Sequence, residues 1–289
     1  MSFILNSFND WIKNFLIGCI TGNLTGMFDD VNSRVGSIAS QVGQTPDGWN
    51  ANIFSMVQNL SQTVIIPIAG MILTFVVCYE LISMIMEKNN MHEMDTWMFF
   101  KWIFKTFIAI YLVTHTFDIT IAVFDMAQHV VQASAGVISG STNIDISSVT
   151  GSLQTQLSGM DVPALFGLWM ESLLISFSIK ILSVCIFLII YGRMLEIYLL
   201  CSIGPIPFAT MTNREWGDIG KNYLKSLFAL GFQGFLIMVC VAIYAVLVQT
   251  ISTTGDIQAA IWSCAGYTVL LCFALFKTGS LSKSIFNAH

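Results

Sequence analysis

Long apolar stretches, each separated from the next by a polar segment, run through most of the chain. Five of them approach or reach the roughly 20 residues that cross a bilayer as an α-helix. Within them the charged side chains are Glu80, Lys105 and Lys180. A backbone in lipid must satisfy its own hydrogen bonds, so runs of this length are expected to be helical. The pattern predicts five membrane-spanning helices, at Val64–Met86, Trp102–Phe117, Leu173–Tyr191, Leu227–Val248 and Ala259–Phe276.

A sixth apolar stretch, Met194–Met211, is broken at Gly204, Pro205 and Pro207. Proline cannot continue a helix and glycine frees the backbone, so a bend is expected there. The sequence then becomes polar and basic in "TNREWGDIGKNYLK". Either this stretch enters the membrane and returns, or it is an ordinary kinked helix.

The positions of lysine and arginine distinguish these two readings, because cytoplasmic loops carry an excess of both residues. Nine basic residues fall on one side only if 194–211 begins and ends at the same face: Lys88, Lys101, Lys105, Arg193, Arg214, Lys221, Lys225, Lys277 and Lys283. We therefore predict a re-entrant segment over 194–213, with the N-terminus outside and the C-terminus cytoplasmic. The same nine residues could attract DNA or an acidic protein surface, although the topological signal alone explains them.

The composition agrees with an all-α, polytopic integral membrane protein. Hydrophobic residues make up 55% of the 289 residues and charged residues 10%, whereas soluble domains carry about 25% charge. The net charge of −5 gives no basic balance that would indicate nucleic-acid binding. The start, "MSFILNSFNDWIKNF", lacks a basic region and a cleavage site, so we interpret it as mature sequence. The seven cysteines form no CxxC pair and are expected to pack as small hydrophobes.

Four parts follow from this pattern. Residues 1–62 are expected to form extracytoplasmic or interfacial helices. Residues 63–117 hold the first two spans and a cytoplasmic loop at 87–101. An extracytoplasmic helical loop covers 118–168, and 169–289 hold the remaining spans, the re-entrant segment and a short cytoplasmic C-terminus.

Two features of the parts outside the spans suggest helix packing. Gly18, Gly22 and Gly26 recur every four residues, a spacing that lets helices approach closely; an interfacial helix with incidental glycines is the alternative. Apolar stripes with helical spacing predict two further helices that pack against other helices. One stripe runs through Phe28, Val31, Val35, Ile38 and Val42, and the other follows Asp145 through Ile146, Val149, Leu153, Leu157 and Met160.

Five ionisable residues lie in or near the predicted spans: Glu80, Glu171, Lys180, Arg193 and Glu196. Such groups are costly in lipid unless they are paired or hydrated. A bridge between Glu80 and Lys180 is one possibility, while Glu171 would reach the outer interface by itself. Arg193 and Glu196 are one helical turn apart and are expected to pair.

The sequence offers no enzyme chemistry. It contains no HExxH, GxSxG, P-loop or GxGxxG motif, so it cannot drive transport by nucleotide hydrolysis, and no cofactor is expected. The residues "HEMD" at 92–95 include metal-ligand types, but they are too few for a site and are interpreted as a solvated loop.

Several long blocks are similar to one family of conjugal-transfer membrane proteins. They are "NLTGMFDDVNSRVG", "QVGQTPDGWNANIFSMV", "EKNNMHEMDTWMFFKWIFKTF", "SIGPIPFATMTNREWG", "ALGFQGFLIMVCVAIYAVLVQ" and "FKTGSLSKSIFNAH". The chain resembles the TrbL type (the VirB-six type) of type IV secretion systems, in the branch carried by integrative elements of Gram-positive bacteria. The resemblance extends over essentially the whole chain.

This resemblance implies a subunit of the conjugation channel in the cytoplasmic membrane, with five spans and an external N-terminus. It implies a homo-oligomeric ring beside a VirB-four-type ATPase and other channel subunits, with relaxase-bound single-stranded DNA as transient cargo. The family has no catalytic residues to assign. An assembly scaffold that never contacts DNA and a secondary transporter of small solutes remain alternatives, although a transporter usually shows repeated halves and this sequence shows none.

The block Gly204–Gly217 is the most distinctive part of the resemblance. We hypothesise that it lines or gates the cytoplasmic entrance of the conduit, with Gly204, Pro205 and Pro207 forming the bend. Arg214 and Glu215 would fix the loop, and Trp216 would anchor it at the membrane interface.

Overall fold

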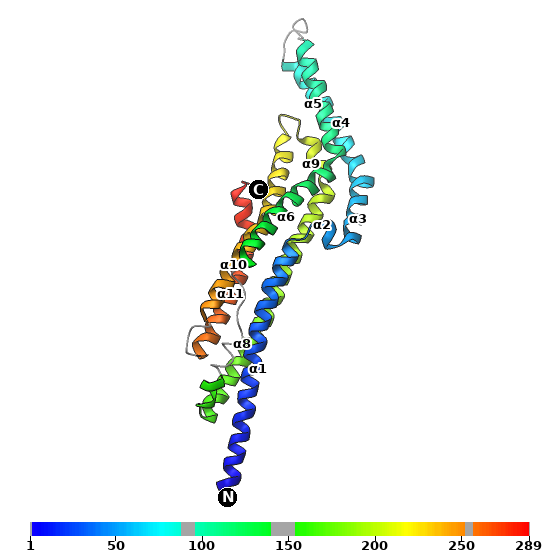
Figure 1. Cartoon of the computed structure of the whole chain (residues 1–289). Coiled ribbons are helices and arrows are strands. Elements are labelled where there is room, and N and C mark those ends of the chain that lie inside the picture. The colour runs from blue at the N-terminus through cyan, green and yellow to red at the C-terminus, as the bar shows by residue number, and fades with distance from the viewer. Residues whose placement is uncertain (1, 88–95, 140–153, 252–256, 289) are drawn as a thin grey trace. The chain divides into compact units, whose positions relative to one another are not determined.

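A computed structural model describes residues 2–87, 96–139, 154–251 and 257–288 (Figure 1). Every regular element among them is helical. The elements in chain order are α1 (Ser2–Val42), α2 (Pro46–Trp49), α3 (Ala51–Leu60), the π-helical turn η1 (Ser61–Ile65), α4 (Ile66–Glu87), α5 (Thr96–Thr114), α6 (Thr116–Ser139), a short helix over 154–158, α8 (Val162–Ile203), α9 (Pro205–Thr210), α10 (Gly217–Ile251) and α11 (Ile257–Ile285).

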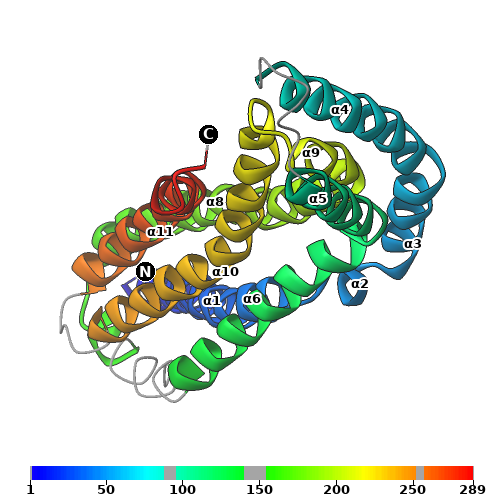
Figure 2. The same cartoon turned by 90° about the horizontal axis from the view of Figure 1, so that it is seen from above.

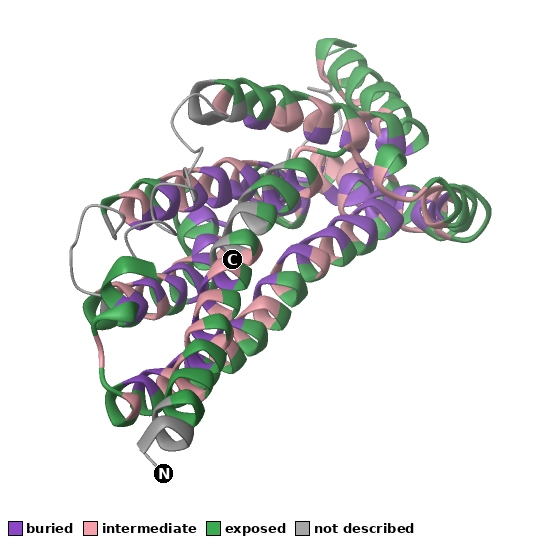
Figure 3. Cartoon of the chain, turned by 60° about the horizontal axis from the view of Figure 1, so that its bottom comes forward, coloured by how far each residue is buried: buried purple, intermediate pink, exposed green. Residues whose placement is uncertain are grey.

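Five stretches of helix are long and apolar enough to cross a membrane, which confirms the predicted fold class. They are Ala51–Met86, Thr96–Thr114, Val162–Ile203, Gly217–Thr250 and Gln258–Ile285. Many large apolar side chains on them are exposed. Figure 3, which colours exposed residues green, shows that such positions recur along the long helices. Phe107 is 66% exposed and Phe273 is 69% exposed, which suits a surface that faces lipid and would be unfavourable in water.

Two predicted boundaries are absent, because helices continue through them. The glycine row and the apolar stripe that ends at Val42 lie on one continuous helix of 41 residues, α1. The third predicted span continues without a break to Ile203, so α8 has 42 residues, about twice the number that a bilayer requires. The predicted re-entrant segment is therefore divided between the end of α8, α9 and the turn that follows. Its path relative to the bilayer stays a prediction.

Other predictions fall partly outside the described residues. The "HEMD" loop lies outside them, as does most of the stripe that follows Asp145, although Leu157 is described and buried. In the stripe of α1, Ile38 and Val42 are buried, while the side chains of the other three members lie outside the description. All seven cysteines are free thiols.

The chain divides into two compact units, and the long helices α6, α8, α10 and α11 contribute residues to both. The first unit comprises 1–42, 132–190 and 236–278. Its helices are joined by polar contacts between apolar faces. Asn23 of α1 donates to the Ser172 hydroxyl of α8 over 3.0 Å, and the hydroxyls of Tyr244 and Thr268 lie 2.9 Å apart between α10 and α11.

The second unit comprises 43–131, 191–235 and 279–289, and it holds the loop that the sequence singled out. The short helix α9 packs against α4 and α5, which lie beside it in Figure 2. Phe208, at the centre of α9, is 1% exposed and belongs to the apolar core of this unit. The core continues through the ends of α8 and α10, where Met194, Ile197 and Leu227 are buried.

Glycines supply the space for the close packing of this unit. Every described glycine has a negative φ, so none is required for an unusual backbone conformation. A Cβ on Gly204 would lie 2.6 Å from the Tyr223 hydroxyl, and one on Gly220 would lie 2.6 Å from the Pro207 carbonyl oxygen. A Cβ on Gly231 would lie 2.9 Å from the Cβ of Ala127. Each distance is too short for a real contact, so these positions accept only glycine without movement of the neighbouring helix.

We predict that Gly220→Ala destabilises the protein. The added methyl group would overlap the backbone of α9, and overpacking of this kind costs about 1–3 kcal/mol. The check is the thermal unfolding midpoint of the purified protein in detergent. Gly192→Ala is the matched control, because a Cβ there meets no atom within 4 Å, and its midpoint should not fall. Equal midpoints for the two variants would contradict the packing argument.

Candidate functional site

The turn between α9 and α10 is held by one buried side chain, Asn213. Its Oδ1 accepts hydrogen bonds from the backbone N–H groups of Glu215, at 2.7 Å, and Trp216, at 3.0 Å. This is the local bonding by which asparagine closes a turn. The other end of the amide, Nδ2, donates to the Glu80 carboxylate of α4 over 3.1 Å. Asn213 is 3% exposed, so one amide fixes the turn and attaches it to α4.

Glu80 extends this connection to a third segment. One carboxylate oxygen accepts from Asn213, and the other lies 3.1 Å from Nζ of Lys105 on α5. The Glu80 side chain is only 15% exposed, so its charge needs these partners. Both oxygens are used, and the bridge to Lys180 that the sequence left open is replaced by Lys105 and Asn213. We call Glu80, Lys105 and Asn213 the latch.

Aromatic packing reinforces the same turn from its other side. The ring of Trp216 stacks on Tyr79, with centroids 5.3 Å apart, and on Phe75, at 5.6 Å. The Tyr79 hydroxyl donates to the Glu215 carboxylate over 2.9 Å. Trp216 and Glu215 therefore hold the turn against α4. For Trp216 the observed partners are the aromatic side chains of α4.

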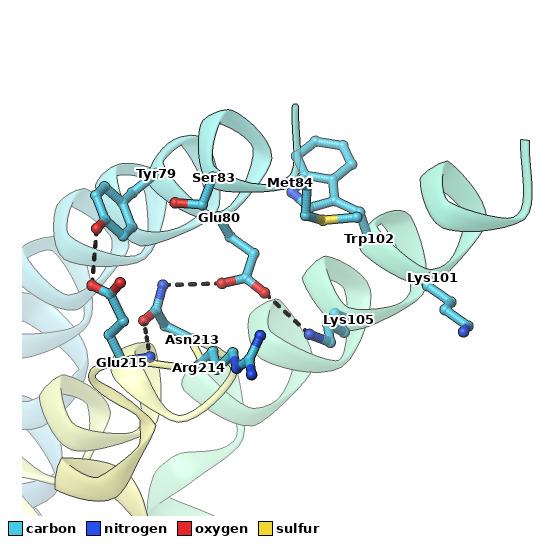
Figure 4. Close-up of a pocket in the computed structure, with 10 residues that line it drawn as sticks. All are labelled: Tyr79, Glu80, Ser83, Met84, Lys101, Trp102, Lys105, Asn213, Arg214 and Glu215. Carbon is cyan, nitrogen blue, oxygen red and sulfur yellow. Dashed lines mark hydrogen bonds and ion pairs between the residues drawn. The ribbon is translucent and has the colours of Figure 1, made fainter. Parts of the chain in front are cut away.

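The latch residues, together with Tyr79 and Glu215, line a cavity of about 230 Å³. Figure 4 shows Glu80 at its centre, bonded on one side to Asn213 and on the other to Lys105, with Arg214 beside them. Lys101 and Lys105 from α5 and Arg214 from the turn line the cavity together with the carboxylates of Glu80 and Glu215. Its wall therefore carries three cationic and two anionic side chains. Arg214 is exposed at the surface of the turn.

The bend that precedes this turn depends on three of the predicted residues. Pro205 and Pro207 have no N–H to donate to the carbonyls of Cys201 and Ile203, so α8 ends and α9 begins. Gly204 has ordinary helical angles, φ −48° and ψ −40°. Its role is therefore space rather than backbone freedom, because Tyr223 passes directly over it to donate to the Leu200 carbonyl over 2.8 Å.

Arg193 lies in the interior of the same unit. It is 6% exposed, and its Nε donates to the backbone carbonyl of Leu230 on α10 over 3.3 Å. Gly234 makes room for it, because a Cβ at that position would lie 2.8 Å from Nη2 of the guanidinium. No carboxylate among the described residues lies within salt-bridge distance of Arg193.

The predicted pair between Arg193 and Glu196 is therefore not formed. Glu196 instead accepts from Nζ of Lys283 on α11, over 2.9 Å. The two residues lie one turn apart along α8, but Arg193 turns inward to α10 while Glu196 reaches α11. A spacing of three residues permits a pair, but the neighbouring helices decide whether it forms.

The first unit contains the remaining predicted residues. Both carboxylate oxygens of Glu171 accept from the side-chain amide of Gln258, at 3.0 and 3.2 Å. Lys180 lines a separate cavity of about 250 Å³ with Gly22 and Gly26 of α1. A Cβ at Gly18, Gly22 or Gly26 would meet no atom within 4 Å, so this row does not bring α1 into close contact with another of the described helices.

Sequence reasoning missed the residues that organise the site. In the sequence, Asn213 and Tyr223 belong to the polar and basic segment that follows the bend, and Tyr79 belongs to an apolar run. The signal available for Asn213 was its place directly before a new helix, where asparagine commonly bonds the backbone. Its attachment to Glu80 has no signal in the sequence, since 133 residues separate the two.

The arrangement suits mechanical and electrostatic roles. Among residues that the structure describes, no three His, Cys, Asp or Glu side chains lie close enough to hold a metal ion. The latch fixes a turn against two helices, and the surrounding cavity offers cationic groups to an anionic ligand or partner.

We predict that Asn213→Asp releases the turn. The substitution keeps the oxygen that closes the turn, but it places a second carboxylate against Glu80 where a donor stood. A hydrogen bond to a charged group contributes about 1.5–3 kcal/mol, and a like-charge contact replaces it. The check is limited trypsin cleavage after Arg214 in detergent, followed by mass spectrometry, and we expect cleavage to be faster.

The paired variant Asn213→Asp with Glu80→Gln should restore slow cleavage, because the glutamine amide can donate to the new carboxylate. Asn14→Asp introduces the same charge at an exposed position of α1 and should leave cleavage unchanged. If the double variant is cut as fast as the single one, Glu80 is not the partner that holds the turn.

One family model matches the chain, the TrbL/VirB6 plasmid conjugal transfer like protein, over residues 31–205. The matched region is more than half of the 289 residues, and it runs from α1 through Pro205 at the bend. No curated protein and no solved structure matches the chain. Taken with the five apolar helices, this match shows that the chain belongs to the TrbL/VirB6 plasmid conjugal transfer-like protein family.

Proposed function

We propose that this protein is a membrane-channel subunit of a conjugative type IV secretion system. In this role it helps relaxase-bound single-stranded DNA to cross the cytoplasmic membrane. The observation that carries the proposal is the family match on a chain with five helices able to span a bilayer. The proposal includes a homo-oligomeric ring, a VirB-four-type ATPase and other channel subunits as partners, and it requires no enzymatic step from this chain.

The distribution of basic residues supports one topology, with the N-terminus outside and the C-terminus cytoplasmic. Lys101, Lys105 and Arg214 lie around one cavity of the second unit, as expected if this end of the unit faces the cytoplasm. A continuous α8 is compatible with the same topology without a re-entrant hairpin. In that case α8 crosses inward, α9 and the turn remain at the inner face, and α10 crosses outward.

We place the inner mouth of the conduit at the turn between α9 and α10. The latch holds this turn, and Arg214 stands exposed beside it. A fixed turn would keep the mouth in one shape, and release of Asn213 from Glu80 would let it move. Strong phosphate binding along the whole wall would slow the passage of DNA. The wall of this cavity carries charges of both signs, which disfavours such continuous binding.

Conjugation frequency tests the role directly. A donor that lacks only this gene should lose transfer, and a complementing copy should restore it. Unchanged transfer would refute a role in conjugation and would favour a small-solute transporter instead. Solute uptake into vesicles that contain the purified protein would then test the transporter function.

We predict that Pro205→Ala with Pro207→Ala lowers transfer at least tenfold while the protein still reaches the membrane. The two restored N–H groups would allow α8 to continue through the bend, which would move α9 from its contact with α4 and α5. Pro163→Ala is the control, because Pro163 is exposed in the first turn of α8, and this variant should transfer at the wild-type frequency. Wild-type transfer by the Pro205 and Pro207 variant would refute the gating role.

Crosslinking separates a channel from a scaffold. We predict that a photoreactive side chain at Arg214 captures transferring DNA, whereas the same group at Phe177, which is 65% exposed on the apolar face of α8, does not. The measurement is recovery of plasmid DNA with the protein after illumination of mating cells. Capture at neither position, in donors that transfer normally, would favour the scaffold.

A further inference from the structure

A second hollow of the second unit lies on an apolar surface rather than near the latch. It is a groove of about 130 Å³ between α6, α10 and the end of α11, lined by Val123, Met126, Ala127, Val130, Phe228, Gly231, Phe232, Phe235 and Phe286. Every lining side chain is apolar, and the groove opens outward because Met126 is 64% exposed and Val130 44% exposed. Such a surface suits a membrane interior.

Four phenylalanine rings form its inner wall. Phe286 stacks on Phe228, with centroids 6.3 Å apart, and meets Phe232 edge-on at 5.7 Å. Phe232 and Phe235 continue the row at 5.2 Å. Contacts of this kind fix the orientation of the rings, so the groove is preformed and needs no side-chain rearrangement to accept a chain of methylene groups.

A lysine stands at one end of the same row. Lys225, Phe228, Phe232 and Phe235 recur at spacings of three, four and three residues, which places them on one face of α10. Among the described residues, the ammonium of Lys225 contacts only the Asn287 carbonyl oxygen, at 3.5 Å. By contrast, nearby Lys221 is paired with Asp218 and Lys283 with Glu196. Lys225 therefore offers its charge to a ligand at the polar end of an apolar row.

The length of the row fits half of a bilayer. Ten residues separate Lys225 from Phe235, which corresponds to about 15 Å along a helix. The hydrocarbon core is roughly 30 Å thick, so one leaflet is about 15 Å. If Lys225 lies at the level of the phosphates, Phe235 lies near the midplane, and a single acyl chain covers the row between them.

We propose that this groove binds one anionic phospholipid of the membrane. Its phosphate lies beside Lys225, and one acyl chain lies along Phe228, Phe232 and Phe235. The site has a cationic group at one end and an apolar wall along its length, so it is complementary to an anionic phospholipid. A purely apolar partner helix would leave the lysine without a counterpart. The proposal rests on the groove alone, and it holds whether or not the protein conducts DNA.

The test uses the purified full-length protein in a neutral detergent. Dimyristoyl phosphatidylglycerol and dimyristoyl phosphatidylcholine are added separately, and bound lipid is counted by native mass spectrometry while thermal unfolding is followed in parallel. We expect phosphatidylglycerol to bind more tightly and to raise the unfolding midpoint further. Lys225→Gln should weaken phosphatidylglycerol binding about fivefold, the effect of one lysine at an anionic lipid surface, and leave phosphatidylcholine unchanged.

Lys277→Gln is the matched control, because Lys277 is an exposed lysine of α11 that does not line the groove, and its lipid binding should equal the wild type. Val130→Trp, which fills the groove from its exposed rim, should lower the binding of both lipids. Equal binding of the two lipids by the wild type would refute the anionic site, and wild-type behaviour of Lys225→Gln would refute its location. Since Lys225 is exposed and its replacement removes no packed group, this variant is expected to fold. Its lipid binding therefore tests the location of the site even if Val130→Trp does not fold.

Discussion

The hydrogen bonds of Asn213 are the interaction on which the second unit depends most. A chain that leaves one long apolar helix and enters another must bury polar backbone in apolar surroundings, and each unpaired group there costs about 1–3 kcal/mol. The Asn213 side chain satisfies part of this backbone locally, because its Oδ1 accepts hydrogen bonds from two N–H groups of its own turn. Because its amide also donates to Glu80, the closed turn is attached to α4. Glu80 in turn binds Lys105, so three segments are positioned together.

Space is the second constraint on this unit. Gly204 lets Tyr223 cross the bend, Gly220 lets α10 start against α9, and Gly234 admits the guanidinium of Arg193 between α8 and α10. In each case a single methyl group would displace a helix or a buried side chain. Arg193 shows how the two constraints combine, because a buried cation is tolerated where a backbone carbonyl is within reach and a glycine leaves room. The bend and the turn are therefore determined by packing as well as by the two prolines.

These constraints bear on the proposed role of the protein. A conduit for DNA needs a mouth of defined shape and a wall that does not retain phosphate. If the turn forms this mouth, as proposed, the hydrogen bonds of the latch would keep its shape, and the mixed charges of the cavity are consistent with a wall that does not retain phosphate. The proposed lipid groove lies in the same unit, on α10 a few turns beyond the turn that Asn213 holds. An occupied groove would brace α6 against α10, since Gly231 and Ala127 already bring these helices into close contact.

The sequence by itself determined the membrane class, the five apolar helices and the position of the bend. These follow from hydrophobic length and from proline chemistry, which act within a few residues of one another. It also placed Arg214, Glu215 and Trp216 in one polar segment directly after the bend, where the structure has the turn between α9 and α10. Tertiary structure decided the rest, because it depends on which helix lies opposite. Glu196 pairs with Lys283 rather than Arg193, and Glu80 pairs with Lys105 and Asn213, since these partners come from other helices. Among the described glycines, a Cβ would lie closer than 3.0 Å to another atom at Gly204, Gly217, Gly220, Gly231 and Gly234, and not along the regular row in α1. Close approach depends on two surfaces, and a sequence shows only one of them.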